Sequence, residues 1–590
     1  MRLSIPVCSK AVVLAFAIVT FAPFAALAGW GPDGATIKST TNNIPKVAAT
    51  NDGGHGTIVA WQEENSPGSG LLRAQRVLVT GDVDPAWAPD GVVICNVATS
   101  RAAIGVVPDA LGGAYVWWKE GAAIFLTRVI STGAIAPNWP ARGRQVGTAW
   151  PSTARPSVIA DGATGIYAAW PGIASGQVDP VSVQAIHLGP TNTGAGGWPN
   201  GPRTLAGWDP VATFEYWPQI ALAPDGGAFL AWASHSSDPE TMTSSYRLRR
   251  VTSAGLNATG WAVEGNDLGV FHGEWLDINP ETGLIGLSED GLGGVFALIG
   301  FLTSSDGYNT TLESRLFRLL ADGSPAPAWP VEGSIVQNGG IAQYWDVGPD
   351  ASHRVFPDGL GGAQVGKASY YGHGTDFALS ATLPEGGWKP SSSAFGNVFG
   401  HEVVPNSSGG VFLGDFSPSG PTGPYQPWAY LRVGQSLAPA GWSQYFEIHY
   451  DNVVQWYGDI ALAQSGDGGA IFFWSQVRER FGLFARRFNG AGEVTAVETP
   501  LAESRLSLSR LRFVVGDGVR VSFVIPVGAE ASFDLYDVTG RRVAATRMHA
   551  EAGGAREVTV PGTRQLAAGL YFAKLATAGD SRAGKVVVAR

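Results

Sequence analysis

A short run of apolar residues recurs along this chain, and each run follows a glycine-rich turn. The five residues after Gly113, Gly165, Gly227 and Gly469 read AYVWW, IYAAW, AFLAW and AIFFW. Because no polar residue alternates with the apolar ones, both faces of such a strand are predicted to be buried. The preceding turns, for example PDALGG and APDGGA, supply the glycines that a tight hairpin requires. The pattern therefore predicts a series of hairpins, each with one fully buried strand.

The glycine turn occurs eight times, with a mean spacing of 59 residues. Its second glycine is found at Gly56, Gly113, Gly165, Gly227, Gly294, Gly362, Gly410 and Gly469. A unit of this length cannot bury its own faces and needs a neighbour on each side. We therefore predict an all-β fold with an eight-bladed β-propeller over residues 29–500. A seven-bladed propeller is the alternative, because the unit at Gly410 is short and follows NSS rather than PDG.

Tryptophan marks two positions of the repeat. In five units it is the fifth residue after the second glycine, where we predict that it fills the gap between neighbouring sheets: Trp61, Trp118, Trp170, Trp232 and Trp474. A second series stands in turns such as WAPDG and WPVEG. The unit at Gly469 lacks such a turn, whereas one stands alone at Trp30. We expect the N-terminal segment to supply the outer strand of the last blade and to close the ring.

Residues 1–28 have the features of a secretory signal peptide. Arg2 and Lys10 are basic, residues 11–27 are apolar, and Ala26-Leu27-Ala28 fits a cleavage site. We expect a secreted protein or one displayed on the outer cell surface. After cleavage Cys95 is the one cysteine left, so no intramolecular disulfide can form. No later run approaches the ~18 apolar residues of a membrane span, and no transmembrane anchor is predicted.

The repeat ends near Pro500, and a second domain is predicted over residues 504–590. The alternation of Val521, Phe523 and Ile525 and a turn at Thr539-Gly540 are typical of a small β-sandwich. The segments that carry the pattern are VSFVIP at 521–526, FDLYDVTGRRV at 533–543, LAAGLYFAKL at 566–575 and KVVVAR at 585–590. This segment resembles the C-terminal immunoglobulin-like sorting domain of cargo of the bacterial type IX secretion system, and the related FlgD-type Ig-like domain.

The resemblance implies a bacterial surface protein whose C-terminal domain contacts the export machinery and whose propeller functions outside the cell. In such cargo the domain is usually removed on export, and whether it is cleaved here stays open. Family members often begin with a strand that contains Asn-Pro, whereas this chain has RLSLSRLRFVV. A purely structural terminal module is therefore the alternative.

Composition and charge narrow the function classes. Only 15% of the residues are charged, the formal net charge is −10 and the pI is near 5.4, which argues against nucleic acid or an anionic membrane surface as a partner. The arginines are dispersed, and we expect Arg247 and Arg249 to lie on a solvated face. No Gly-x-Ser-x-Gly, His-Glu-x-x-His, Cys-x-x-Cys or P-loop motif occurs. The sequence thus predicts no catalytic residue, no metal site and no cofactor, and we expect a monomer.

Aromatic residues that precede the glycine turns form the candidate ligand site. The residues are Tyr216, Trp217, Trp275, Trp345, Trp456 and Tyr457, with Glu215 and Asp346 as neighbouring acceptors. Trp150, Trp208 and Tyr344 are further aromatics of this kind, and Glu274 and Asp459 are further carboxylates beside them. Connections of this type emerge on one face of a propeller, where aromatic rings can stack on a sugar or a peptide. The alternative is that these rings cap the blade ends.

We predict a secreted or cell-surface module for binding or adhesion, without turnover. The alternative is an extracellular glycan-active hydrolase with paired carboxylates about 5 to 9 Å apart on the same face.

Overall fold

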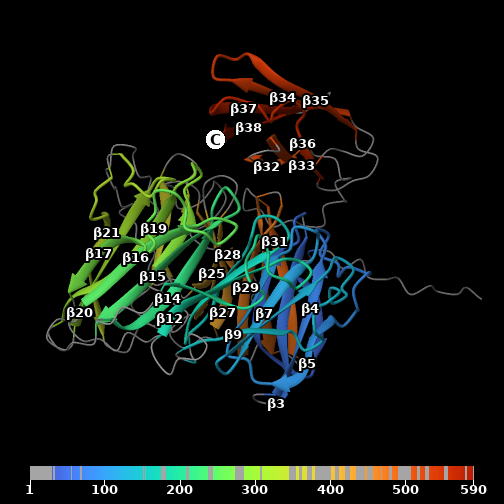
Figure 1. Cartoon of the computed structure of the whole chain (residues 1–590). Coiled ribbons are helices and arrows are strands. Elements are labelled where there is room, and N and C mark those ends of the chain that lie inside the picture. The colour runs from blue at the N-terminus through green and yellow to red at the C-terminus, as the bar shows by residue number, and fades with distance from the viewer. Residues whose placement is uncertain are drawn as a thin grey trace, which may run out of the picture.

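The computed structural model is built of antiparallel β-sheets, and its described residues contain no helix (Figure 1). The structure describes residues 30, 34–54, 56–66, 69–150, 152, 154–173, 181–206, 212–236, 243–272, 285–305, 309–327, 329–343, 354–357, 362–368, 375–378, 400–405, 411–418, 425–432, 446–447, 456–466, 468–477, 481–489, 507–514, 518–524, 530–549, 556–577 and 581–588. The predicted signal peptide, residues 1–28, lies outside them. Within these ranges no helix has the length and apolarity to cross a membrane.

Up to residue 489, the described strands form seven four-stranded sheets and one three-stranded sheet. The first sheet is β2 (Asn43–Asn51), β3 (Thr57–Ser66), β4 (Ser69–Val77) and β5 (Val92–Thr99). The second sheet is β6 (Ile104–Pro108), β7 (Ala114–Glu120), β8 (Ala123–Val129) and β9 (Arg144–Thr148). The third sheet is β10 (Ser157–Ala160), β11 (Ile166–Ile173), β12 (Val181–Leu188) and β13 (Arg203–Ala206).

The following sheets repeat this order. The fourth sheet is β14 (Ala212–Leu222), β15 (Ala228–Ser236), β16 (Thr243–Val251) and β17 (Asn266–His272), and the fifth is β18 (Ile285–Glu289), β19 (Val295–Ser305), β20 (Asn309–Leu319) and β21 (Ser334–Gln343). The three-stranded sheet is β22 (Arg354–Pro357), β23 (Ala363–Ala368) and β24 (Thr375–Ala378). The next is β25 (Gly400–Pro405), β26 (Val411–Pro418), β27 (Tyr425–Arg432) and β28 (Phe446–Glu447).

The last sheet of this series joins the two ends of the repeat. Its strands are β29 (Trp456–Gln464), β30 (Ala470–Val477), β31 (Phe481–Phe488) and β1 (Ala35–Thr40). Strand β1 pairs antiparallel with β31, with Ala35 opposite Ala485 and Thr40 opposite Phe481. The prediction that the N-terminal segment completes the last sheet is therefore confirmed.

The first strands of consecutive sheets lie side by side. Contacts join β2 to β6, β6 to β10, β10 to β14, β14 to β18 and β18 to β22, and β29 contacts both β25 and β2. Sheets that follow one another in this way and return to the first one have the arrangement of a β-propeller. The backbone of Asp459 in β29 is also fixed at this closure, because its N–H donates to Ser475 Oγ, which donates to the Ile44 carbonyl at 2.8 Å.

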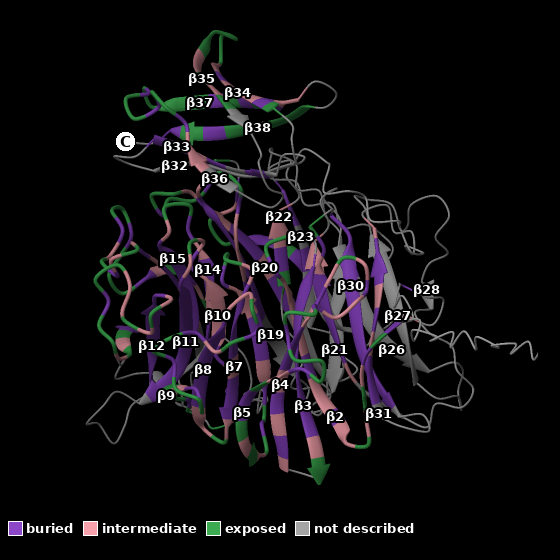
Figure 2. Ribbon diagram, turned by 90° about the vertical axis from the view of Figure 1, so that its right-hand side faces the viewer, coloured by how far each residue is buried: buried purple, intermediate pink, exposed green. Residues whose placement is uncertain are grey.

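The hydrophobic cores lie between neighbouring sheets. One cluster combines Ile58 and Leu72 of the first sheet with Val116 and Trp118 of the second. Figure 2 shows strands of several sheets in purple, which marks buried residues, among them β11 and β30. The five tryptophans that follow the glycine turns are at most 1% exposed: Trp61, Trp118, Trp170, Trp232 and Trp474. These side chains fill the space between sheets, where dense packing of large rings stabilises the fold.

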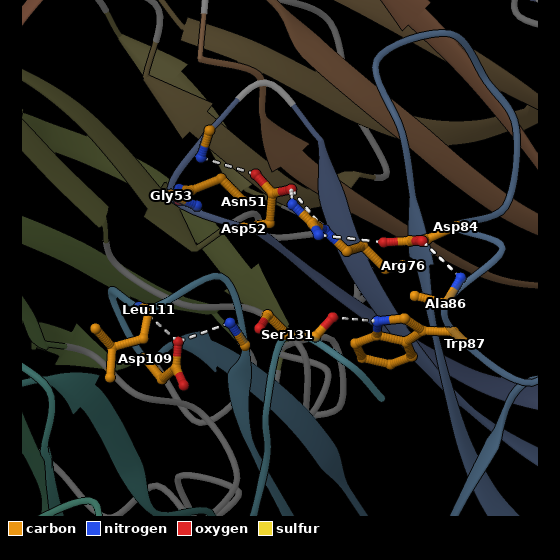
Figure 3. A network of polar contacts seen from close by, with 12 residues as sticks. Asn51, Asp52, Gly53, Arg76, Asp84, Ala86, Trp87, Asp109, Leu111 and Ser131 are labelled. Atoms are coloured by element: carbon orange, nitrogen blue, oxygen red, sulfur yellow. Dashed lines mark hydrogen bonds and ion pairs between the residues drawn. The ribbon is translucent and has the colours of Figure 1, made fainter. Parts of the chain in front are cut away.

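The tryptophans of the second series hold each sheet to the next. Their indole N–H groups donate to a turn carbonyl of the following sheet over 2.7 to 3.1 Å, from Trp30 to Val79, Trp87 to Ser131, Trp139 to Pro190, Trp198 to Ser253 and Trp261 to Ala321. Figure 3 shows the contact between Trp87 and Ser131. Each of these tryptophans is at most 6% exposed. The hydrogen bond therefore satisfies a buried donor at each of these five junctions.

Two further sheets form the C-terminal part of the described chain. The first is β32 (Ser507–Val514), β33 (Gly518–Val524) and β36 (Arg556–Thr559). The second, in the order β35-β34-β37-β38, is β35 (Arg542–His549), β34 (Glu530–Asp537), β37 (Gly569–Ala576) and β38 (Ser581–Val588). One core joins them, with Val521 and Phe523 of the first packed with Phe533 and Leu575 of the second. This part is therefore a small two-sheet sandwich, which we call the C-terminal module.

Candidate functional site

The ring of sheets has two different ends. Thr57 lies opposite Val77 at the end that carries the glycine turns and the tryptophan turns, which we call the turn face. Ser66 lies opposite Ser69 at the other end, which carries the hairpins between second and third strands and the connections from one sheet to the next. We call it the connection face. The predicted ligand residues that lie in β14 and β29 belong to this second end.

On the turn face, aspartates bind both the backbone of their own turn and a cationic side chain. Asp109 Oδ1 accepts hydrogen bonds from the N–H groups of Leu111 and Gly113, both at 2.8 Å. Its Oδ2 accepts from Nε and Nη2 of Arg128 at 2.9 and 2.7 Å. Equivalent ion pairs join Asp52 to Arg76 and Asp290 to Arg318. In the fourth sheet Arg250 pairs instead with Asp225, which stands two residues later in its turn and has a side chain that is 47% exposed. The buried carboxylates of this series are engaged in folding contacts.

Figure 3 shows how the first sheet extends this arrangement. Arg76 donates to Asp52 at 2.7 Å and to Asp84 at 3.1 Å, so that one guanidinium joins the glycine turn to the tryptophan turn. Asp84 Oδ1 in turn accepts from the Ala86 N–H at 2.8 Å. The network fixes the turn that carries Trp87.

In the third sheet a histidine replaces the arginine. His187 Nε2 lies 3.0 Å from Asp161 Oδ2, and the His187 ring stacks on Tyr167 with centroids 3.9 Å apart. Burial by itself would raise the pKa of the Asp161 carboxyl. The hydrogen bonds from His187 and from the N–H groups of Ala163 and Gly165 outweigh burial, and the pKa lies below its usual value. The carboxylate is thus held ionised.

One expectation about the arginines is wrong. Arg249 is not on a solvated face: it is 8% exposed, and its guanidinium donates to the Leu205 carbonyl and to Asn257 Oδ1. Burial lowers the pKa of this guanidinium. Its acceptor Leu205 belongs to β13 of the third sheet, so the Arg249 side chain is covered by the neighbouring sheet. Arg247 on the same strand is half-buried.

On the connection face, two glutamates are engaged with polar partners. Glu63 accepts from Thr40 Oγ1 at 2.6 Å and from Asn42 Nδ2 at 3.1 Å, and Arg73 Nε lies 2.9 Å from its other oxygen. Glu120 accepts from Trp118 Nε1 at 3.0 Å and pairs with Arg142 at 3.0 Å. These contacts tie β1 to the first sheet and hold the end of β7.

The buried ammonium of Lys119 organises two connections of this face. Its Nζ donates to the carbonyls of Ser152 and Ala154 at 2.6 and 2.5 Å, in the connection from the second sheet to the third. Its backbone N–H donates to the Ala103 carbonyl in the connection from the first sheet to the second. A lysine that is 0% exposed would be costly without such acceptors. Lys119 therefore fixes the conformation of both segments.

Trp150 stands on the connection that Lys119 holds. Its N–H donates to the Pro171 carbonyl at 2.8 Å, while the preceding Ala149 N–H donates to the Ala122 carbonyl at 2.9 Å. The Trp150 residue is nevertheless 47% exposed. A large aromatic ring is thus presented to solvent on a fixed backbone, which is the requirement for stacking on a flat apolar ligand surface.

The structure places five of the predicted ligand residues within paired strands. Glu215, Tyr216 and Trp217 belong to β14, and Trp456 and Tyr457 belong to β29. The expectation that they lie in loops is therefore wrong. Pairing with the second strand continues beyond the apolar run through a bulge, between Tyr216 and Gln219 in β14 and between Tyr457 and Ile460 in β29.

The other candidate residues lie outside the described residues: Trp208, Glu274, Trp275, Tyr344, Trp345 and Asp346. Asp459, which follows the Trp456-Tyr457 pair, has a structural partner, because its Oδ2 accepts from the Val47 N–H at 2.8 Å across the junction between the last and first sheets.

Other chemistry on the described residues is limited. They contain no group of three or more His, Cys, Asp and Glu side chains able to hold a metal ion. Cys95 is buried and carries a thiol. An open hollow of about 590 Å³ lies between the turn at 88–93 and the turn at 132–134, lined mainly by backbone and small apolar side chains with Arg73 and Asp90. The Asp90 carboxylate pairs there with Lys38 at 2.7 Å.

Comparison with known proteins finds similar solved structures but no matching family. No family model matches this chain. No curated protein matches it. Among solved structures, the chain is similar to the polysaccharide lyase Uly1, with 10% identity over 64% of this chain and 88% of that chain and a TM-score of 0.38. It is also similar to the polysaccharide lyase PL25 ulvan lyase bound to -[GlcA(1-4)Rha3S]-, with 9% identity over 78% and 97% and a TM-score of 0.35.

A third similar structure is the β-propeller domain of the Trilobed protease from Pyrococcus furiosus, with 12% identity over 67% of this chain and 91% of that chain and a TM-score of 0.29. At these identities and TM-scores, the similarities carry no argument about function. The propeller assignment rests on the order of the sheets and on the contacts between them.

Proposed function

We propose that this protein is a secreted or cell-surface β-propeller that binds a glycan on its connection face. The observation that carries the proposal is the half-exposed Trp150, held on a backbone that Lys119 and two backbone hydrogen bonds fix. A preordered aromatic ring stacks on the apolar face of a sugar at little entropic cost. The tyrosine and tryptophan pairs in β14 and β29 extend the same end of the ring.

The propeller has eight blades in this proposal, and the signal peptide of residues 1–28 directs export. The repeated sheets of four strands and the pairing of β1 with β31 support a closed ring of eight units. The C-terminal module is immunoglobulin-like and serves as a sorting or anchoring domain that contacts the export machinery. Its two-sheet core supports this proposal. Deleting residues 504–590 and measuring surface display in the native host tests it.

Turnover of the bound glycan is the second candidate. Two of the similar solved structures are polysaccharide lyases by name, but at TM-scores of 0.38 and 0.35 they assign neither a ligand nor a reaction to this chain. On the connection face Glu63 and Glu120 are engaged with cationic partners, whereas the partly buried Glu64 accepts from the neutral Gln62 amide at 2.6 Å. The exposed Trp150 on its fixed backbone makes binding our first proposal.

A glycan array with the purified full chain tests the proposal, with mass spectrometry of the supernatant to detect product. We expect Trp150→Ala to reduce glycan binding at least tenfold, since a stacked ring contributes about 1.5 kcal/mol beyond solvent exclusion. Leu292→Ala is the matched control, because Leu292 is 50% exposed on the turn face. Equal binding by Trp150→Ala and the unmodified chain would exclude this site, and a cleaved product would establish the enzyme instead.

A further inference from the structure

The formal charge of the chain is divided unevenly between its parts. From residue 504 to 590 the sequence has 13 Lys and Arg against 7 Asp and Glu, which gives +6. The remaining 503 residues therefore carry −16 of the total of −10. An average over the whole chain conceals a basic C-terminal module. Such asymmetry between parts of one chain indicates an interaction with an anionic surface.

The four-stranded sheet of the module has one buried and one solvent-facing side. On β37, Tyr571, Ala573 and Leu575 are buried in the shared core. Leu570, Phe572 and Lys574 alternate with them and are exposed. Figure 2 shows this alternation on β37 and β38, with exposed positions in green. Residues directly opposite one another in antiparallel strands share a face, so the register defines the exposed side, which we call the outer face.

The outer face carries four cationic side chains. Lys585 lies opposite Phe572, Arg542 lies opposite Tyr536, and Arg547 lies opposite Ser532, while Lys574 is on β37 itself. All four are exposed. The acidic residues of this face are Asp534, opposite Lys574 and 3.2 Å from the Arg542 guanidinium, and the exposed Glu530 at the start of β34. Two positive charges remain in excess on one side of one sheet.

Apolar side chains are clustered at one end of the same face. Leu570 lies directly opposite Val587, and Phe572 is the next residue of the face along β37. They are 37%, 51% and 46% exposed. A sheet with one solvated face usually presents polar residues there. Adjacent exposed Leu, Val and Phe depart from that pattern and mark an interaction surface.

We propose that the outer face of the C-terminal module docks on a lipid surface with anionic headgroups. The apolar trio enters the boundary between headgroups and acyl chains, while Arg542, Arg547, Lys574 and Lys585 attract the headgroups. A soluble polyanion would match the cations but gives Leu570 and Val587 nothing to bury against, so the combination favours the lipid surface. The inference goes beyond the proposed glycan site and does not rest on it.

Vesicle sedimentation with the purified full chain tests this inference. We expect the protein to pellet with vesicles of equal parts phosphatidylcholine and phosphatidylglycerol, and not with phosphatidylcholine alone. Added salt should weaken the binding by screening the charges. Because the rest of the chain is strongly acidic, binding to anionic vesicles would originate in the module.

Paired variants locate the surface. Each cation near an anionic leaflet contributes about fivefold in affinity, so Arg547→Glu with Lys585→Glu should weaken binding at least about 25-fold. Arg564→Glu with Arg582→Glu changes the net charge equally and is the control, because Arg582 lies opposite the buried Leu575 and Arg564 precedes β37. We expect less than about a fivefold effect from this control, the contribution of a single contacting cation.

A second set of variants tests the contribution of the apolar side chains to vesicle binding. Leu570→Ser with Phe572→Ser should reduce binding severalfold at fixed charge, whereas Val538→Ser, at a turn residue 68% exposed, should not. Circular dichroism of every variant confirms folding, which exposed substitutions change little. Absence of binding, equal binding to neutral vesicles, or equal losses in both charge pairs would overturn the proposal. Displacement by dextran sulfate together with no effect of the serine pair would replace the lipid with a polyanion.

Discussion

The two ends of the ring of sheets use charged residues for different purposes. On the turn face an aspartate four residues before the second glycine of the turn pairs with an arginine or a histidine in four sheets. On the connection face the residue after the buried tryptophan is Lys119 in the second sheet but Gln62 and Pro171 in its neighbours, and Lys119 holds the segment that presents Trp150. The ion pairs that repeat from sheet to sheet stabilise the fold, whereas contacts found at one junction, such as those of Lys119, can position a ligand site.

The largest effect should come from breaking a buried pair of the turn face. Arg128→Ala leaves the Asp109 carboxylate, whose side chain is 0% exposed, without its cation. We expect a loss of about 3 to 5 kcal/mol in unfolding free energy. Arg142→Ala is the matched control, because the Arg142 side chain is 56% exposed in its pair with Glu120, and should cost under about 1 kcal/mol. Urea unfolding measures both, and similar costs would remove the distinction between repeated and exposed pairs.

Removing the Lys119 ammonium on the connection face should cost less stability than breaking the Asp109–Arg128 pair, but it should also weaken glycan binding. Lys119→Met keeps most of the side-chain volume but leaves the carbonyls of Ser152 and Ala154 without their donor. We expect about 1 to 3 kcal/mol of destabilisation from these buried acceptors. Hydrogen exchange should increase over residues 149–156, and glycan binding should fall together with it. Unchanged exchange there would contradict the positioning role of Lys119. Lys38→Met serves as the control, because the partner of Lys38 is Asp90, whose side chain is 80% exposed.

The smallest effect should depend on pH. The pKa of Asp161 is lowered in the folded state, so its carboxylate stabilises the fold above about pH 4, and this stability is lost as the pH falls through the lowered pKa. Asp161→Asn should cost about 1 kcal/mol at pH 7 and less at pH 3. Thermal melting at the two pH values measures the difference. A cost that stays constant with pH would show that the carboxylate charge is not what stabilises this turn.

Much of the architecture could be predicted, because apolar runs and turn residues within a few neighbouring positions indicate where the strands begin and end. The apolar runs after the glycine turns predict the buried second strands β7, β11, β15 and β30, and each is found there. The tryptophan turn left over at Trp30 predicts the pairing of β1 with β31. Ligand residues were harder to place, because the bulges in β14 and β29 extend the strands past the apolar run.

The partners of individual side chains could not be predicted from local sequence patterns. Arg249 reads as a surface residue in sequence, yet its acceptor at Leu205 lies 44 residues away and buries it. The net charge of −10 argues against an anionic membrane surface, whereas the outer face of the C-terminal module carries a local excess of positive charge. A chain average contains no information about which charges share a face.

The sequence by itself determined the repeat, the buried strands, the hairpins and the closing N-terminal strand, because apolar periodicity and turn residues act over a few neighbouring positions. Only the tertiary structure decided which aspartates find an arginine, which lysine is buried under a connection, and which tryptophan remains in solvent. Those outcomes depend on strand register and on contacts between sheets, which bring together residues far apart in the chain, such as Val47 and Asp459.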